Sequence, residues 1–119
     1  LYCQAHTLLG AHNFGVSDEK LAAVWTYATS PLYTDRERVA LDFALAAAAQ
    51  PNEVTDELFA RLREHWSEGE IVELLGVVAM FGFLNRWNDS MATPLESVPA
   101  EVAHKAIGAQ GWTAGKHAG

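Results

Sequence analysis

The sequence predicts an all-α fold of about six helices joined by short connections. No stretch alternates apolar and polar residues with the period of two that strands show, and no Asn-Gly or Asp-Gly pair marks a hairpin. Residues that cap and end helices recur along the whole chain. Between them, apolar residues return every three or four positions, which is the spacing of an amphipathic helix. Helices with such short connections favour antiparallel packing.

The first two predicted helices lie before Pro31. Residues 1–13 contain no Asp, Glu, Lys or Arg, and Gly15 is well placed to end the first helix. Ser17 and the acidic residues after it predict the start of a second helix, whose apolar stripe would run to Ala28. Pro31 then stops this helix, because the residue before a proline is pushed out of the helical region.

Two capping boxes predict the starts of the two longest helices. Thr34 and Glu37 can satisfy each other's free amides at the start of an alanine-rich helix. Ser67 and Glu70 do the same for the most hydrophobic helix, residues 71–88, which is apolar nearly all round. We therefore expect a central buried helix, and a hairpin of these two helices as the core.

The rest of the chain completes one predicted domain, residues 1–119. A shorter helix lies between the two long ones, and a last short helix spans residues 100–107 after Pro99. Residues 111–119 form a C-terminal tail with one large apolar anchor, Trp112, amid small residues. Such a tail becomes ordered only if Trp112 docks, either on its own chain or on a neighbouring subunit.

The composition excludes several classes of protein. Half of the residues are apolar, which is typical of a globular chain and excludes disorder. Fifteen acidic residues against eight basic ones give a net charge of −7, so we expect neither nucleic acid nor an anionic membrane as partner. The longest uncharged apolar run, residues 74–84, is too short to span a bilayer. The single cysteine excludes an internal disulfide and disfavours a zinc site, so we expect a cytoplasmic protein without metal or other cofactor.

The chain opens at Leu1 without the charged region, apolar stretch and cleavage site of a signal peptide. The run Leu1-Tyr2-Cys3 resembles the interior of an apolar segment rather than a natural terminus. We therefore expect that an N-terminal segment is missing before Leu1.

The clearest chemical pair is Cys3 and His6, three residues apart. On a helix this spacing places two Cβ atoms on one face, roughly 5–6 Å apart. A free thiol has a pKa of about 8.5 and becomes a nucleophile only when deprotonated. A nearby imidazole can accept its proton. Both residue types also occur in ordinary cores, so the alternative is a small buried hydrophobe beside a histidine with structural partners.

A second polar cluster closes the most hydrophobic helix. Asn85, Arg86 and Asn88 could face the helix that carries Cys3 and hydrogen-bond its polar groups. The alternative is that a cation at this end complements the negative end of the helix dipole. His12, on a somewhat different face of the first helix, is a further supporting candidate.

Several motifs together carry a family resemblance. They are Tyr2-Cys3-Gln4-Ala5-His6-Thr7, Ser17-Asp18-Glu19-Lys20-Leu21, Ser30 to Arg38, Glu70 to Leu74 and Phe83 to Asn88. With these motifs the chain resembles the carboxymuconolactone decarboxylase and alkylhydroperoxidase D (AhpD) superfamily, from Leu1 to about Leu95. The resemblance implies an AhpD-like helical bundle whose subunits assemble into a homo-oligomer, such as a dimer, trimer or hexamer.

The resemblance also implies a thiol site. In the peroxidase branch of the superfamily, a Cys-x-x-Cys pair is followed within a turn by a histidine, and a glutamate lies upstream. Cys3 matches the second cysteine and His6 the histidine, while the other two residues would precede Leu1. Many members place the histidine four residues after the cysteine, whereas here the separation is three.

The activity implied by the resemblance is the reduction of alkyl hydroperoxides. The Cys3 thiolate, activated by His6, would attack the terminal peroxide oxygen and become a sulfenic acid. A second thiol would condense with it, and a lipoylated or thioredoxin-like protein would reduce the resulting disulfide.

Two other interpretations stay open. A cofactor-free decarboxylase of the carboxymuconolactone type would use acid–base groups rather than a thiol. A non-catalytic helical oligomerisation module would merely bury Cys3. Residues 1–16 carry little charge and the central helix is apolar on all faces, so six short helices leave apolar surface uncovered. Contacts between subunits are the simplest way to bury that surface.

Overall fold

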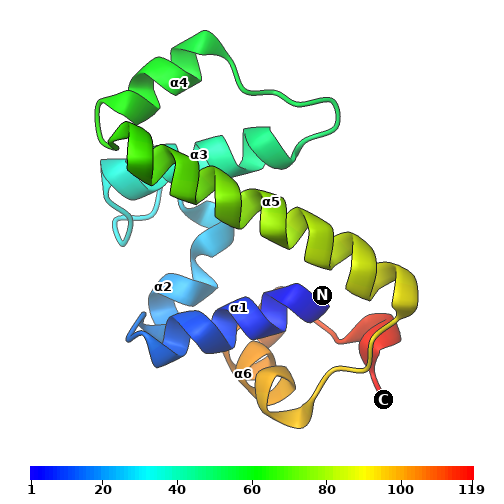
Figure 1. The fold of residues 1–119 in the computed structure, drawn as a ribbon. Coiled ribbons are helices and arrows are strands. Elements are labelled where there is room, and N and C mark those ends of the chain that lie inside the picture. The colour runs from blue at the N-terminus through cyan, green and yellow to red at the C-terminus, as the bar shows by residue number, and fades with distance from the viewer. The chain divides into compact units, whose positions relative to one another are not determined.

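The computed structural model describes residues 1–119, which form six α-helices, three short 3-10 helices and no strand (Figure 1). The α-helices are α1 (Tyr2–Asn13), α2 (Asp18–Ala22), α3 (Asp35–Ala48), α4 (Asp56–Arg63), α5 (Glu68–Met91) and α6 (Ser97–Ile107), and the 3-10 helices are Val24–Thr26, Gly108–Gln110 and Gly115–His117. The predicted all-α class and number of helices are therefore confirmed. The chain forms two compact units, one of residues 1–26 with 84–119 and one of residues 27–83.

Both predicted capping boxes are present. At the start of α3 the Glu37 amide donates to Thr34 Oγ1 (3.2 Å), and the Thr34 amide donates to the Glu37 carboxylate (2.9 Å). At the start of α5 the Ser67 amide donates to the Glu70 carboxylate (2.8 Å). These bonds satisfy amides that have no acceptor within the helix, which is why both helices begin where the sequence predicts.

The end of α1 also follows the sequence prediction. Gly15 has φ +84°, a left-handed conformation that favours glycine. Its amide donates to the His12 carbonyl (2.9 Å), and the amide of Val16 donates to the Ala11 carbonyl (3.0 Å). This pair of bonds is a Schellman motif, and it ends α1 while satisfying two of its last carbonyls.

The second helix is shorter than predicted. Ser17 caps α2 as expected, because its side chain accepts a hydrogen bond from the Lys20 amide (3.3 Å). However, α2 ends at Ala22 and a 3-10 turn follows, instead of one helix to Ala28. The residues after Ala22 are rich in β-branched and aromatic types, which lower helix propensity, and the Thr26 hydroxyl bonds back to the Ala23 carbonyl (3.1 Å).

The last helix starts earlier than predicted. It begins at Ser97, so Pro99 lies within its first turn rather than before it. A proline is tolerated there because the amides of a first turn have no acceptor within the helix.

In the unit of residues 1–26 and 84–119, α1 and α6 lie side by side (Figure 1). Its core consists of apolar side chains from α1, α2, α6 and the tail, namely Ala5, Leu8, Leu21, Ala103, Ala106, Ile107 and Trp112. Trp112 is only 6% exposed, so the predicted anchor docks on its own chain. The tail is ordered for that reason, and its last turn brings His117 into a buried position.

In the unit of residues 27–83, α3 packs mainly against α4. The buried core is formed by Val39, Phe43, Leu62 and Ile71. The predicted hairpin of α3 and α5 is therefore wrong as a description of the core, because α5 contributes only its first turns. Trp66 packs against this core. Its Nε1 donates to the Arg36 carbonyl (3.0 Å), and the guanidinium of Arg36 stacks on its ring (4.0 Å).

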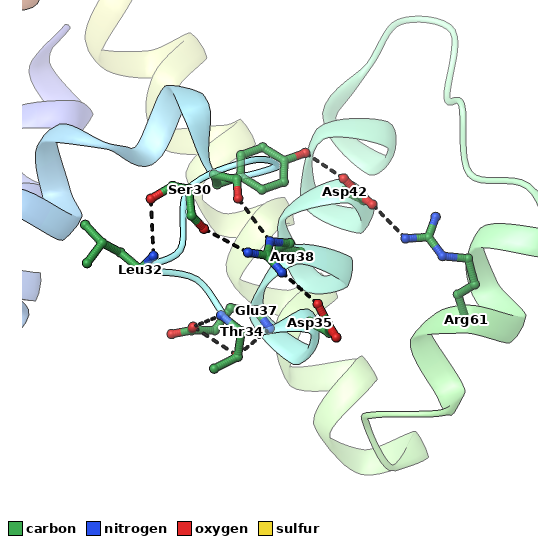
Figure 2. A network of polar contacts seen from close by, with 9 residues as sticks. Ser30, Leu32, Thr34, Asp35, Glu37, Arg38, Asp42 and Arg61 are labelled. Carbon is green, nitrogen blue, oxygen red and sulfur yellow. Dashed lines mark hydrogen bonds and ion pairs between the residues drawn. The ribbon is translucent and has the colours of Figure 1, made fainter.

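Arg38 fixes the loop that precedes α3 (Figure 2). Its guanidinium donates to the Tyr27 carbonyl (3.2 Å), the Ser30 carbonyl (2.8 Å) and the Asp35 carboxylate (2.7 Å). The Tyr27 hydroxyl donates to Asp42 (2.6 Å), and this hydrogen bond is the main reason why the pKa of Tyr27 is raised to about 12. The unit thus has a local polar network outside its apolar core.

The prediction of a central buried helix is wrong for this chain by itself. Only Ile71 of α5 is buried. Large apolar side chains along the helix are exposed, namely Val72, Leu75, Val77, Met80, Phe83, Trp87 and Met91. An all-round apolar pattern does not specify which faces are covered, and here the chain covers only the first turns. None of the helices combines the length and the apolarity that crossing a membrane requires.

Candidate functional site

A cavity of about 500 Å³ lies within the unit of residues 1–26 and 84–119. Three segments contribute to its wall: the first turn of α1, the last turns of α5 and the tail. The lining residues are Leu1, Tyr2, Cys3, Gln4, Asn85, Arg86, Asn88, Asp89, Ser90 and His117. This volume is in the range of sites for small molecules. The cavity brings together four of the predicted site residues, which are Cys3, Asn85, Arg86 and Asn88.

Cys3 is a free thiol, 8% exposed, in the first turn of α1. The cavity gives small molecules access to this thiol, and access is one condition for the reactivity of a cysteine.

The polar partners of His6 are residues other than Cys3, although the predicted spacing is present. Its Nδ1 lies 3.2 Å from the Tyr2 carbonyl oxygen and its Nε2 lies 3.2 Å from a carboxylate oxygen of Glu96. The Tyr2 ring stacks on the imidazole (4.4 Å between centroids), and its hydroxyl donates to the same carboxylate (3.3 Å). Both ring nitrogens thus have partners other than the thiol, and His6 is not part of the cavity wall. Its catalytic role stays a prediction.

His12 lies at the other end of α1. Its Nδ1 is 3.2 Å from the Asp18 carboxylate, which also pairs with Lys105 (2.9 Å). The hydrogen bond from Lys105 is the main reason why the pKa of Asp18 is lowered. These contacts join α1, α2 and α6 on the surface, away from the cavity that contains Cys3.

The end of α5 contributes polar residues to the cavity wall. Asn85 and Arg86 line the cavity together with Asn88, whose side-chain amide donates to the Leu84 carbonyl (3.0 Å). Arg86 lies more than one turn before the end of α5 at Met91, so its charge is not at the negative end of the helix dipole.

His117 is a site residue that the sequence analysis did not single out. It is 1% exposed and lines the same cavity as Cys3. Its Nδ1 lies 2.9 Å from the Thr93 carbonyl oxygen and its Nε2 lies 3.6 Å from Asp89 Oδ1. Cys3 and His117 stand at opposite ends of the chain, so no local spacing could pair them.

The tail reaches the cavity because of its small residues. A Cβ at Gly115 would lie 2.7 Å from the end of the flexible Leu1 side chain, which would have to move to make room. The residue also has φ +55°, which favours glycine. The Leu95 amide donates to the His117 carbonyl (2.8 Å) and fixes the turn. The docked Trp112 followed by small residues is the sequence signal that could have pointed to this segment.

Two ionisable groups that line the cavity, Tyr2 and Asp89, have shifted pKa values. The hydrogen bond from Lys116 (3.1 Å) is the main cause that lowers the pKa of Asp89, and the neighbouring His117 acts in the same direction. Burial is the main cause that raises the pKa of Tyr2, and Glu96 adds to it. Asp89 is thus a carboxylate beside the buried imidazole. The structure contains no group of three or more His, Cys, Asp or Glu side chains that could hold a metal ion.

Comparisons with known proteins add a sequence relative and a structural neighbour. The chain is 35% identical over 82 residues to the uncharacterized protein YnjA of Escherichia coli K12, a match that covers 69% of this chain and 45% of YnjA. Its structure matches the apo debrominase Bmp8 with a TM-score of 0.80 and 33% identity, over 88% of this chain and 56% of Bmp8. The same values hold for a cysteine-to-alanine variant of Bmp8 in complex with 2,3,4-tribromopyrrole. No family model matches the chain.

These likenesses establish the fold and a relation to an enzyme. The chain is an all-α bundle of the AhpD-like type, as the sequence predicts. The resemblance to the carboxymuconolactone decarboxylase and AhpD superfamily is supported by the same structures. The chain spans about half the length of the two proteins that it matches.

Proposed function

We propose that this chain carries the reactive thiol of an enzyme that reduces a small electrophilic substrate, with Cys3 as the attacking group. The observation that carries the proposal is the place of Cys3 in the wall of a cavity of about 500 Å³. The likeness to a debrominase that was also studied as a cysteine-to-alanine variant supports a cysteine-based reaction. The first substrate class is an alkyl hydroperoxide, which the family resemblance implies.

The reaction with a hydroperoxide begins at the thiolate. The sulfur attacks the terminal oxygen, an S–O bond forms and the O–O bond breaks. The leaving alkoxide takes up one proton and becomes an alcohol, and Cys3 becomes a sulfenic acid. Asn85, Asn88 and Arg86 offer hydrogen-bond donors in the same cavity wall, where they can hold the peroxide oxygens.

A second thiol completes the cycle. It condenses with the sulfenic acid, which releases water and leaves a disulfide. This chain has one cysteine, so the second thiol belongs to a partner molecule or to sequence outside this chain. A dithiol reductant of the lipoylated or thioredoxin type then restores both thiols by exchange.

A brominated heteroaromatic compound is the second substrate class, and the likeness to Bmp8 favours it. The thiolate would take the bromine, so that an S–Br bond forms as the C–Br bond breaks, and a proton would replace bromine on the ring carbon. A second thiol would then displace bromide and leave a disulfide. Both substrate classes therefore use the same attacking atom and the same two-electron reductant.

The test uses the purified chain with a dithiol reductant and two substrates, cumene hydroperoxide and 2,3,4-tribromopyrrole. We expect formation of the alcohol or release of bromide, and loss of that activity in Cys3→Ser. The exposed His65→Asn is the matched control. Equal turnover by the Cys3→Ser variant would contradict the proposal. Decarboxylation of a lactone carboxylate by that variant would support the cofactor-free decarboxylase instead. Absence of turnover with all of these substrates in the wild-type chain would support the oligomerisation module.

A further inference from the structure

We propose that His117, in the C-terminal tail, is the group that exchanges a proton with Cys3 and with the leaving group of the substrate. This inference rests on the proposed function of Cys3. His117 is the imidazole in the wall of the cavity that contains the thiol, whereas His6 lies outside that wall. The tail therefore carries part of the site, in addition to its role in closing the core.

The hydrogen bond of His117 determines which ring nitrogen can react. Nδ1 lies 2.9 Å from the carbonyl oxygen of Thr93, which can only accept, so Nδ1 carries a proton in both charge states of the ring. Proton exchange is thus confined to Nε2, and the Thr93 carbonyl fixes the orientation of the ring. His6 has a carboxylate closer to its Nε2, since Glu96 lies at 3.2 Å there and Asp89 lies at 3.6 Å from Nε2 of His117.

A carboxylate lies beside the reactive nitrogen of His117. Asp89 Oδ1 lies 3.6 Å from Nε2, so the imidazolium has an anionic neighbour. The ring is 1% exposed, whereas the Asp89 side chain is 64% exposed, so water reaches this pair from the carboxylate side. The ionisable groups that face it or share its cavity are Tyr2 and Cys3 from α1, Arg86 and Asp89 from α5, and Lys116 beside it in the tail.

The proton balance of the hydroperoxide reaction closes with this single group. The S–H bond of Cys3 breaks as the N–H bond at Nε2 of His117 forms, which leaves a thiolate beside an imidazolium. After the sulfur has attacked the terminal peroxide oxygen, the imidazolium returns the proton to the alkoxide. The products are a sulfenic acid and an alcohol, and His117 is neutral again.

The decisive variant is His117→Asn. The asparagine side-chain amide can still donate to the Thr93 carbonyl, so the tail retains its hydrogen bond while the reactive nitrogen is removed. The first readout is the pH profile of Cys3 alkylation by iodoacetamide, which does not depend on any substrate. We expect the profile of this variant to move to higher pH, and turnover of cumene hydroperoxide to fall by roughly 10²-fold. His65→Asn, with an exposed ring, should leave both unchanged.

A measurement on the unmodified chain keeps the inference falsifiable if the variant unfolds. Long-range ¹H–¹⁵N NMR should show neutral His117 with its proton on Nδ1, and the opposite tautomer would overturn the inference. An unchanged alkylation profile in folded His117→Asn would overturn it as well, and so would a shifted profile in His6→Asn alone. If Cys3→Ser retains full turnover, the proposed function itself fails, whereas loss of turnover in Cys3→Ser with a normal His117→Asn variant removes only the role of His117.

Discussion

The two units of the chain differ in the interactions that stabilise each of them internally. In the unit of residues 27–83, a side-chain cap starts each helix, and the polar network around Arg38 joins residues that are close in sequence (Figure 2). In the other unit Ser17 caps α2 but no side chain caps α6, and residues from the two ends of the chain line one cavity. The comparison teaches that local signals build the scaffold, whereas the site depends on long-range docking.

Among the variants proposed here, removing the tail anchor Trp112 should cause the largest loss in the free energy of unfolding. Trp112→Ala empties a buried position in the core of the unit that contains the cavity, which costs roughly 3–5 kcal/mol in the free energy of unfolding. It also releases the tail, so the reactivity of Cys3 should fall in the same variant. Urea unfolding and peroxide turnover would measure both effects.

Two matched variants sharpen this prediction. Leu62→Ala opens a cavity in the other unit and should cost roughly 2–5 kcal/mol, yet the folded fraction should keep the reactivity of Cys3. Trp112→Phe should cost much less than Trp112→Ala, because the buried Nε1 has no hydrogen-bond partner to lose. An unaltered free energy of unfolding in Trp112→Ala would show that the anchor does not hold the tail.

The exposed apolar side chains of α5 lead to a prediction about assembly. We propose that they form the contact of a homo-oligomer, because a surface of this kind is costly to leave in water. Leu75→Glu combined with Val77→Glu should lower the molar mass in light scattering at micromolar concentration to that of one chain. Glu73→Gln on the same helix is the control. A wild-type chain that is already monomeric would contradict the proposal.

The capping box of α3 should have a smaller, local effect. Thr34→Ala removes the oxygen that accepts the Glu37 amide, and we expect a loss of roughly 0.5–2 kcal/mol in the free energy of unfolding. Thr34→Ser retains the hydroxyl and should lie close to the wild type. Alkylation of Cys3, which belongs to the other unit, should be the same in all three chains, and a change there would contradict a purely local effect.

The smallest effect should appear at high pH. The pKa of Tyr27 is raised to about 12, mainly by its hydrogen bond to Asp42, from an ordinary value of 10.0. A proton held more tightly in the folded state stabilises it below pH 10, and that contribution is lost as the pH rises toward 12. The urea midpoint should fall slightly over this interval in the wild type and less in Tyr27→Phe. Equal slopes would contradict this account of the hydrogen bond.

The sequence predicted the scaffold well where the determining interactions are local. The capping boxes at Thr34 and Ser67 and the left-handed Gly15 each depend on residues within one turn. The apolar pattern of α5 predicted burial, but within one chain that helix is mostly exposed. Periodicity reports how apolar a helix is, and it does not report which partner covers it.

The candidate site was predicted only in part. The sequence singled out Cys3 and the polar end of α5, which do share a cavity. It also paired Cys3 with His6, since i and i+3 share a helix face, but the side chain of His6 turns to Glu96. The contribution of His117 requires the tail to fold back on α1, and no local pattern encodes that contact.

The most direct test of the central claim is covalent trapping at the single cysteine. The folded chain would be treated with a limiting amount of cumene hydroperoxide in the presence of dimedone, and the intact mass would be measured. Because the chain has one cysteine, a sulfenic acid can form only at Cys3. We predict one dimedone adduct per chain, located on Cys3 by peptide mapping. An unmodified Cys3 in a folded chain that has been exposed to both hydroperoxide and 2,3,4-tribromopyrrole would contradict the account.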